Sequence, residues 1–542
     1  MDVLTGLSPR ELAAVEWQAR VKWSYGSNAI VGWNLETRTV QVNCYGERVK
    51  KWKGWIDFEE HQPTLFCLEN VRSGFDTPGE WFYDVTAERI RYRPLPGEML
   101  AELFCIAPLA GLTSVLRLEG DPEKGAFITD MTFSGIVFSH TRTDGDVRPD
   151  GFVQQYQYQA AVKAGGAIFG KNVQRVVFEN CCVSQVDNYG LWLGEGCVSN
   201  RIVGCMFDDL GAGGVWIGDG RQNCYRTGRE NEPEGVRVPY GEPSTQAFHP
   251  SAFIVIEDCE ISCAGRVNPE ACGVVLANVS DSSVTHCDIH DLYYTGVSVG
   301  WTWGYGGSFA QRNTIAFNRI YDIGKHVMAD MGGVYTLGTS FGTCVSNNVI
   351  HSIDSISYGG WGLYNDEGSE GIVMENNLVY DTTDASYHQH YGRNNVVRNN
   401  IFVGARKCQL AVTRPEPHLS VTFERNIVAW DYDGPAYREP MWMRGLVDGT
   451  ARVNWTNNLF WCLSGPTVVN APHPVIAADP CFVDAARHKY QLENDSPAFR
   501  FGFSMWDVSK SGRRGPAEFQ HDLPSLWLGT RRGGRQAPRI AH

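Results

Sequence analysis

A short sequence pattern recurs through the middle of the chain, from about residue 125 to about residue 460. Each copy has a β-branched run, an Asn or Asp beside a small residue, another apolar residue, and a turn rich in Gly and Asp. A period of roughly 23 to 31 residues is typical of a solenoid in which each repeat forms one coil. The clearest anchors of the pattern are Asn318, Asn347, Asn376, Asn399 and Asn426.

The repeats favour a parallel arrangement of short strands. Each apolar run is too short to bury its inward face alone, and stacking the coils buries it against its neighbours. Asparagine amides at equivalent corners can bond to the coils above and below, and Gly-rich corners such as GAGGVW and DMGGVY allow positive φ angles. A doubly wound α/β fold would need helical segments between the strands, and none is evident. We predict an all-β right-handed parallel β-helix, with a β-sandwich as the structural alternative.

The first 115 residues lack the repeat and predict a small β-rich cap, packed on one end or side of a solenoid at 116–480. Ser8, Pro9 and Glu11 form a capping box that predicts a helix running through LAAVEWQARVKW. Short strands follow at AIVGWNL, TVQVNC and TLFCLENV, and GEWFYDVTAERIRYRPLPGE predicts a hairpin. Residues 481–542 are expected to form a terminal partial coil and a flexible basic tail.

Charge and composition limit the partners of the chain. A formal net charge of -14 argues against nucleic acid, because a polyanionic partner selects for a basic surface. The 17 Trp and 22 Tyr fit a neutral carbohydrate partner held on flat aromatic faces, with core filling as the equally weighted alternative for any single ring. No run of about 18 apolar residues suggests a membrane span. The sequence leaves the oligomeric state open.

The cysteines and the N-terminal residues bear on the cellular compartment and on metals. Sixteen Cys in a chain this long, several inside apolar strand patterns, predict buried thiols rather than a disulfide scaffold. The absence of a CxxC pair argues against a structural zinc site, and we expect neither metal nor cofactor.

The opening MDVLTGLSPRELAAVEWQ lacks the features of a signal peptide, which predicts a cytoplasmic protein as written, or a secreted one if the N-terminus is truncated.

Four segments together resemble glycoside hydrolase family 141 and its relatives. They are GEWFYDVTAERIRYRPLPGE, DMGGVYTLG, GLYNDEGS and HQHYGRNNVVRNNI, and DPCFVD and DSPAFRFGF near the C-terminus fit as well. The resemblance implies a parallel β-helix enzyme with α-L-fucosidase or xylanase activity and two catalytic Asp residues, matched here by Asp330 and Asp366. Members of the family usually begin with a secretion signal and a first solenoid coil, whereas this chain starts inside the cap.

The two aspartates suit the chemistry of glycoside hydrolysis. That reaction needs one carboxylic acid to protonate the leaving oxygen and one carboxylate to act as base or nucleophile. Asp330 and Asp366 lie about one coil apart, and parallel rungs are roughly 4.8 Å apart, so both can reach one cleft. Without the resemblance, each would be interpreted as an Asp that stabilises its own turn. Glu367 competes with Asp366 because neighbouring residues in a strand point to opposite faces.

Substrate contacts are expected around these carboxylates. His388 and His390 alternate across one residue and would face the same side of an extended strand; their spacing also suits a metal, but no third ligand is evident. Several aromatic residues lie in Gly-rich loops near the predicted cleft, and polar side chains occur where a later strand should continue. The expected substrate-binding residues are His388, His390, Tyr335, Tyr364, Trp301, Trp303, Trp361, Gln409 and Arg414, with His418 nearby.

Two other functions remain alternatives. A polysaccharide lyase on the same fold would need a basic residue as catalyst and a cation for the uronate, and the central region lacks a clustered basic face. A noncatalytic carbohydrate-binding or tailspike-like scaffold would need aromatic platforms without paired acids. Within the hydrolase interpretation, fucoside against xylan and chain-end against internal cleavage stay open, because loop shape decides them.

Overall fold

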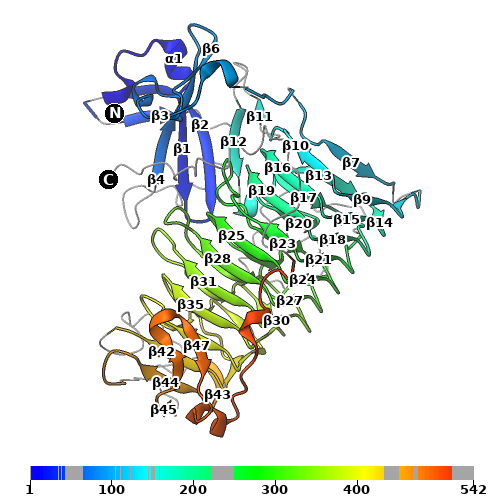
Figure 1. Ribbon diagram of the computed structural model, residues 1–542, viewed down its shortest axis with the longest axis vertical. Helices are drawn as coiled ribbons and strands as arrows, with labels where there is room; N and C mark the ends of the chain where they lie inside the picture. The colour runs from blue at the N-terminus through cyan, green and yellow to red at the C-terminus, as the bar shows by residue number, and fades with distance from the viewer. Residues whose placement is uncertain are drawn as a thin grey trace.

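The computed structural model describes residues 2–34, 36–37, 39–42, 65–103, 105–109, 111–121, 124–143, 146–147, 153–157, 159–220, 249–432, 451–467 and 474–515. From β7 onwards the chain winds into a stack of coils, each built from short strands (Figure 1). Equivalent strands of successive coils pair in parallel and form three long sheets of 10, 11 and 12 strands. This architecture confirms the predicted parallel β-helix.

The three sheets run the length of the stack. The first sheet contains β7 (Leu116–Glu119), β13 (Gly166–Lys171), β17 (Tyr189–Leu193), β20 (Val215–Gly218), β23 (Val274–Ala277), β26 (Val297–Gly300), β29 (Met331–Thr336), β32 (Gly360–Asn365), β36 (Tyr387–Gln389) and β40 (Leu410–Val412). The second contains β9 (Thr132–Ser134), β15 (Val177–Glu179), β18 (Arg201–Val203), β21 (Val255–Glu257), β24 (Ser283–Thr285), β27 (Thr314–Ala316), β30 (Cys344–Ser346), β34 (Val373–Glu375), β38 (Asn395–Arg398), β41 (Leu419–Glu424) and β43 (Arg452–Thr456). The third contains β10 (Val137–Ser139), β16 (Cys182–Val186), β19 (Met206–Leu210), β22 (Glu260–Ile261), β25 (Asp288–Leu292), β28 (Arg319–Ile323), β31 (Val349–Ile353), β35 (Leu378–Thr382), β39 (Ile401–Val403), β42 (Ile427–Trp430), β44 (Leu459–Cys462) and β45 (Ile476–Ala477). Two short parallel pairs, β8 (Ile128–Thr129) with β14 (Val173–Gln174) and β33 (Ser369–Glu370) with β37 (Gly392–Arg393), lie at the corners.

The core fills the inside of the coils. In the second sheet the middle residue of each strand points inward, and the residues stack in register from coil to coil. Burying each such side chain stabilises the fold by about 1.5 to 3 kcal/mol. This row comprises Ile256, Val284, Ile315, Val345, Met374 and Val397, all buried.

A ladder of buried asparagines lines one corner of the solenoid, as predicted. In three coils, however, the residue in the ladder is the Asn that follows the expected anchor. Asn347, Asn376 and Asn399 directly precede ladder members and adopt the left-handed backbone conformation that turns the corner, with φ of 58°, 56° and 54°. Asn tolerates this conformation better than most residues, which explains why the sequence has Asn-Asn there. Side-chain amide bonds of 2.9 to 3.1 Å connect the ladder, which runs through Asn318, Asn348, Asn377, Asn400, Asn426 and Asn458.

Cysteines continue this ladder toward the N-terminal end. The backbone N–H of Cys287 donates to Asn318 Oδ1 at 3.0 Å, so the thiol and the amide occupy equivalent corners. Each residue of the row directly precedes a strand of the third sheet, and all are free, buried thiols. The predicted buried thiols are therefore present in Cys181, Cys205, Cys259 and Cys287.

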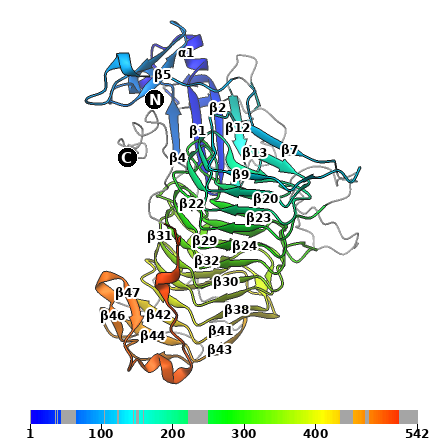
Figure 2. The same cartoon turned by 45° about the vertical axis from the view of Figure 1, so that its right-hand side comes forward.

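The cap contains a sheet in the order β11-β12-β2-β1-β4, with β3 paired to β2 (Figure 2). Two of these strands, β11 (Asp146–Val147) and β12 (Val153–Gln157), come from beyond residue 115, so the chain enters the first coil and returns to the cap before continuing. The predicted hairpin is present as β5 (Trp81–Asp84) and β6 (Arg89–Tyr92), and short 3₁₀ turns lie at Asp2–Leu4, Arg72–Gly74 and Leu100–Glu102. The remaining strands are β1 (Glu16–Val21), β2 (Ser24–Asn34), β3 (Thr39–Val42) and β4 (Leu65–Glu69).

The predicted N-terminal helix is much shorter than expected. Its capping box at Ser8 and Glu11 is present, but α1 (Pro9–Ala13) ends after one turn. The rest of the predicted helix is β1, which pairs with β2 on one edge and β4 on the other. Long-range pairing therefore overrides local helix propensity in this segment.

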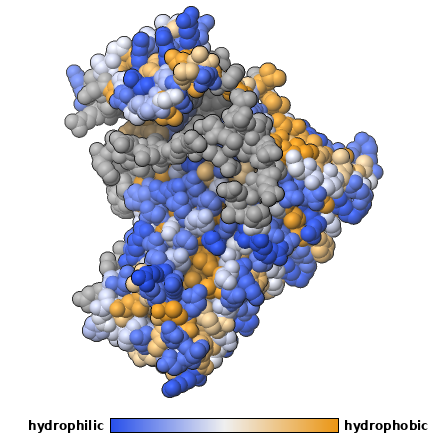
Figure 3. Space-filling model, viewed as in Figure 1, coloured by the Kyte–Doolittle hydropathy of each residue, from blue (hydrophilic) through white to orange (hydrophobic). Residues whose placement is uncertain are grey.

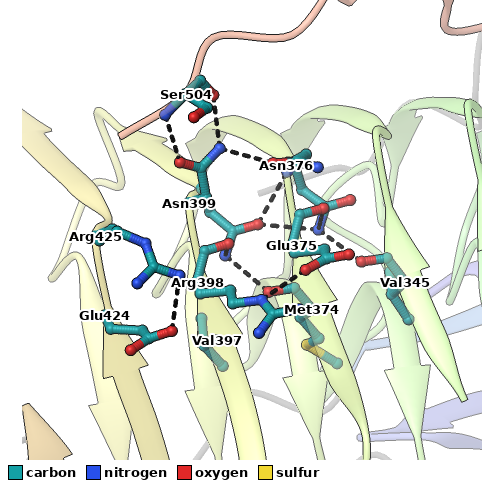
Figure 4. Close-up of polar contacts among 12 residues, drawn as sticks. Val345, Met374, Glu375, Asn376, Val397, Arg398, Asn399, Glu424, Arg425 and Ser504 are labelled. Carbon is teal, nitrogen blue, oxygen red and sulfur yellow. Dashed lines mark hydrogen bonds and ion pairs between the residues drawn. The ribbon is translucent and has the colours of Figure 1, made fainter. Parts of the chain in front are cut away.

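The C-terminal segment runs back along the solenoid instead of adding a partial coil (Figure 1). The strands β46 (Phe482–Asp484) and β47 (Lys489–Leu492) form an antiparallel hairpin, with 3₁₀ turns at Ala485–Arg487, Pro497–Phe501 and Val508–Lys510. The backbone of Ser504 bonds both ends of the Asn399 amide at 2.7 Å, and Asn399 also donates to Asn376 (Figure 4). Farther along, Gly512 N–H donates to Phe317 O at 2.7 Å, so the segment crosses the coils in reverse order. The predicted basic tail, RRGGRQAPRIAH at 531–542, lies outside the described residues.

The surface along the coils is largely hydrophilic, and hydrophobic residues gather between the cap and β7 (Figure 3). This segment exposes Met99, Leu100, Ile106 and Leu109. Within the part of the chain that the structure describes, no helix is long and apolar enough to cross a membrane.

Candidate active site

Asp330 and Asp366 both lie within hydrogen-bonding distance of the Tyr364 hydroxyl, although they flank opposite ends of two paired strands. Asp330 directly precedes β29 and Asp366 directly follows β32, on adjacent coils of the first sheet. The Tyr364 hydroxyl lies 3.1 Å from Asp330 Oδ1 and 2.9 Å from Asp366 Oδ1. These two carboxylate oxygens are thus at most about 6 Å apart, a separation seen between catalytic carboxyls of glycosidases.

Further hydrogen-bond donors fix the orientation of both carboxylates. Tyr335 Oη donates to Asp366 Oδ2 at 2.6 Å, and Tyr358 Oη donates to Asp330 Oδ2 at 3.2 Å. Because the phenols are themselves buried or half-buried, they hold the carboxylates in one arrangement. Each carboxylate nevertheless remains partly exposed to solvent.

Burial affects the two aspartates unequally. Desolvation, together with the negative charge of Asp366, raises the pKa of Asp330 to about 7, against the opposing hydrogen bonds. Burial also raises the pKa of Asp366, but donation from Tyr335, from the Glu367 backbone and from Tyr364 opposes it. Two acids that interact this closely titrate as a pair, and the less stabilised anion keeps the proton. The contacts therefore favour the proton on Asp330 and the negative charge on Asp366.

The shared tyrosine gives this proton a defined path. The Tyr364 hydroxyl has one hydrogen and can donate it to only one carboxylate at a time. When Asp330 is protonated, its own hydroxyl can donate to Tyr364 Oη, and Tyr364 then donates to the ionised Asp366. One residue thus couples an acid and a base on neighbouring coils.

The backbone around Asp330 is shaped for this position. Asp330 has a φ of 57°, in the left-handed region. The neighbouring coil passes so close that a Cβ on Gly359 would lie 2.5 Å from Asp330 Cα, so only glycine fits there. The buried carboxylate of Asp384 accepts a hydrogen bond from Gly359 N–H and lies 3.3 Å from Lys407 Nζ. Strained corners of this kind persist where surrounding contacts over-determine them.

Glu367, the competing acid, faces a different set of groups. Tyr391 Oη donates to Glu367 Oε2 at 3.2 Å, and Arg414 Nη1 lies 3.5 Å from Glu367 Oε1. Arg414 also covers the Tyr391 ring, 4.7 Å from its centroid, and its side chain is 63% exposed. Burial and the charge of Asp366 raise the pKa of Glu367. Its contacts place it at the open rim, beside the carboxylate pair.

The two histidines meet at one hydroxyl. His388 Nε2 and His390 Nδ1 lie 2.9 Å and 2.8 Å from Thr413 Oγ1. The His388 ring is 3% exposed and stacks on Tyr364, with ring centroids 4.8 Å apart, so it supports the shared tyrosine from behind. Burial lowers the pKa of His388 well below its usual range and that of His390 to about 4. Both rings are neutral at the pH where Asp330 titrates.

Comparison with known proteins defines the fold around this site. A family model described as "Right handed beta helix region" matches residues 247–429, which include both aspartates. The chain contains a right-handed parallel β-helix. Among curated protein sequences none matches the chain.

Solved structures show the same β-helix. One titled "Glycoside hydrolase" is 22% identical, with a TM-score of 0.58, over 72% of this chain and 68% of that one. A periplasmic alginate epimerase is 12% identical (TM-score 0.36; 58% and 70% covered), and a GH136 lacto-N-biosidase from Eubacterium ramulus is 9% identical (TM-score 0.37; 62% and 60% covered). With a TM-score of 0.58 and 22% identity, the first of these structures supports the β-helix fold alone.

Two expected substrate contacts belong to the core of the β-helix. Trp301 is 1% exposed, donates to Gly220 O at 3.1 Å, and has Trp216 and Trp303 against it, so no ring face is open to a sugar. Gln409 is fully buried, and its amide bonds the backbone of Ala405 at both ends. Both predictions are corrected: these side chains stabilise turns. Trp303 is half-buried, and Trp361 lies behind Tyr364 beside His388.

Several residues of the site have no strong sequence signal. Tyr358 and Gly359 lie in YGGWGLY, in which the sequence predicted roles only for Trp361 and Tyr364, and Asp384 and Thr413 lie in ordinary strand-to-turn segments. Their roles arise from contacts between coils that sequence spacing does not specify. Others that were missed are Tyr294, which donates to the Asp330 carbonyl at 3.0 Å, and Gln159, which donates to Tyr294 at 3.3 Å.

Proposed function

We propose that this protein is a glycoside hydrolase acting on a neutral polysaccharide or oligosaccharide of fucoside or xylan type. Asp330 is the general acid, and Asp366 is the base or nucleophile. The supporting observation is the pair of partly open carboxylates on one tyrosine, with the pKa of Asp330 raised to about 7 and Asp366 stabilised as the anion. Glycoside hydrolysis uses such an unequal pair.

In the proposed reaction Asp330 transfers its proton to the glycosidic oxygen as the bond to the anomeric carbon breaks. Asp366 then either attacks that carbon or removes a proton from an attacking water. Because the two oxygens that contact Tyr364 are at most about 6 Å apart, both acids can contact one glycosidic bond, as retaining and inverting mechanisms alike require.

The charges around the cleft favour a neutral sugar. Asp330, Asp366 and Glu367 are acidic, and Arg414, the cation beside them, lies against Glu367. A uronate would meet net negative charge there, which disfavours the lyase alternative. The half-buried ring of Tyr391 borders the site and fits the flat face of a sugar ring. The solved structure titled as a glycoside hydrolase, with a TM-score of 0.58, has an activity of the proposed class.

The test is hydrolysis of a panel of aryl glycosides, including fucosides and xylosides, and of plant polysaccharides. Asp330→Asn and Asp366→Asn should each lower kcat/KM by about 10²-fold or more while the protein stays folded. Asp381→Asn is a matched control, because Asp381 also has a left-handed backbone (φ 52°) but pairs with Arg406 on the third sheet. Its activity should equal that of wild type.

Other outcomes separate the alternatives. Full activity in either site variant refutes that assignment and makes Glu367→Gln the next variant to measure. An unsaturated, ultraviolet-absorbing product would indicate a lyase. Sugar binding without turnover in wild type would indicate a noncatalytic scaffold.

A further inference from the structure

The cap reaches the carboxylate pair through the tip of its central hairpin. Strands β1 and β2 run down alongside the upper coils (Figure 2) and are joined by the two-residue turn Lys22-Trp23. Lys22 O accepts a hydrogen bond of 3.0 Å from Ala329 N–H, and Ala329 directly precedes Asp330. Trp23 packs against the main core of the solenoid, with Lys22 Nζ 5.5 Å from its ring centroid. The tip is therefore fixed at the Asp330 side of the site.

Lys22 occupies a turn position whose backbone conformation glycine adopts with less strain. Lys22 has a φ of 55° at the first position of a two-residue hairpin turn, and such turns favour glycine there. A non-glycine residue in this region costs about 1 to 3 kcal/mol and is commonly found at ligand-contacting sites. The turn thus holds the tip in one conformation against the solenoid.

The cap also supplies Gln159 to the site. Strand β12 pairs with β2, with Gln157 opposite Tyr25, and the chain then enters a 3₁₀ turn at Gln159–Ala161. Gln159 donates to the Tyr294 hydroxyl at 3.3 Å, and Tyr294 in turn donates to the Asp330 carbonyl. A cap residue therefore supports the backbone at Asp330.

The opposite side of the site has a different character. Beyond Asp366 lie Glu367, Tyr391 and Arg414, which come from the solenoid itself, and the Arg414 side chain is 63% exposed. A polymer cleaved internally must extend past both sides of the carboxylate pair. The hairpin tip and Gln159, both from the cap, lie on the Asp330 side.

We infer that the cap closes the cleft on the Asp330 side, so that the enzyme removes sugars from a chain end instead of cutting inside the chain. The inference rests on the proposed hydrolase function and specifies its substrate as a terminal sugar. In this inference Trp23, the half-buried ring of the hairpin tip, blocks the position of a further sugar unit and is the specificity-determining residue.

The test follows product size over time. A hexasaccharide of the backbone that wild type hydrolyses is labelled at its reducing end and digested with wild type, Trp23→Ala and Trp81→Ala. Trp81 is the matched control, a cap tryptophan that is 62% exposed on β5. Wild type and Trp81→Ala should release monosaccharide and a pentasaccharide first, and Trp23→Ala should raise the ratio of oligosaccharide to monosaccharide released at least tenfold. Thermal unfolding checks that each variant is folded.

Two results overturn the inference while leaving the hydrolase proposal intact. One is release of di- and trisaccharides by wild type at the earliest time points. The other is an unchanged monosaccharide-first pattern in folded Trp23→Ala. Absence of any product from wild type on every panel substrate, by contrast, refutes the hydrolase proposal itself, and the inference with it.

Discussion

Asp330 and Asp366 share the hydroxyl of Tyr364, which lies 3.1 Å from one carboxylate and 2.9 Å from the other. The two acids come from adjacent coils, one before and one after the paired strands β29 and β32. A single phenol therefore holds two carboxylates from different coils close together, as the proposed hydrolysis requires.

Replacing this phenol should alter both acids at once. In Tyr364→Phe the hydrogen bonds that lower the pKa values of Asp330 and Asp366 are lost, so both pKa values should rise. The pH–rate profile should move to higher pH, and kcat should fall roughly 10- to 100-fold. Tyr387→Phe is the control, because that buried phenol bonds Asn365 and Gln389 on the same sheet. An unshifted profile in Tyr364→Phe would show that the shared hydroxyl does not set the acidities.

The pH dependence of wild type should be bell-shaped. Activity requires protonated Asp330, so kcat/KM should fall as pH rises through about 7. It also requires ionised Asp366, whose raised pKa places the acid limb above the ordinary aspartate value. The limb near 7 belongs to the carboxylate and not to histidine, because burial lowers the pKa of His390 to about 4. In His390→Gln the alkaline limb should therefore stay in place; its loss would assign that limb to the histidine.

The sequence predicted the solenoid because its repeat is a local pattern that burial enforces at every coil. The ladder position was displaced by one residue at Asn347, Asn376 and Asn399, since the pattern Asn-Asn does not say which amide turns inward. Asp330 and Asp366 were predicted through a family resemblance, whereas Tyr358 and Tyr294 contact Asp330, and Gln159 contacts Tyr294, only because distant segments meet. The short α1 has the same cause, because the pairing of β1 between β2 and β4 is invisible in local propensity.

The free energy of unfolding should also depend on the protonation of Asp330. The folded-state pKa of Asp330, about 7, lies above its unfolded value of 3.8, so the fold binds this proton more tightly than the unfolded chain does. The contribution is fully present below about pH 4 and is lost as pH rises through about 7. Asp330→Asn cannot ionise and should be more stable than wild type above pH 7, by about 1 to 2 kcal/mol. Thermal unfolding at pH 5 and pH 8 checks this, and a stability difference that does not grow between those pH values would contradict it.

The asparagine ladder gives a prediction about the solenoid itself. Asn377 accepts hydrogen bonds from the backbone and side chain of Asn348 and donates to Val345 O and Asn400, so Asn377→Ala leaves buried backbone groups without partners. Each buried group left unsatisfied costs about 1 to 3 kcal/mol, and the unfolding temperature should fall by several degrees. Its neighbour Asn376 has a φ of 56°, so Asn376→Gly relieves strain while losing one bond from Asn399, and stability should change little. The two positions are adjacent, so equal losses of stability in Asn377→Ala and Asn376→Gly would contradict this prediction. They would mean that the turn at this corner, and not the amide ladder, stabilises the stacked coils.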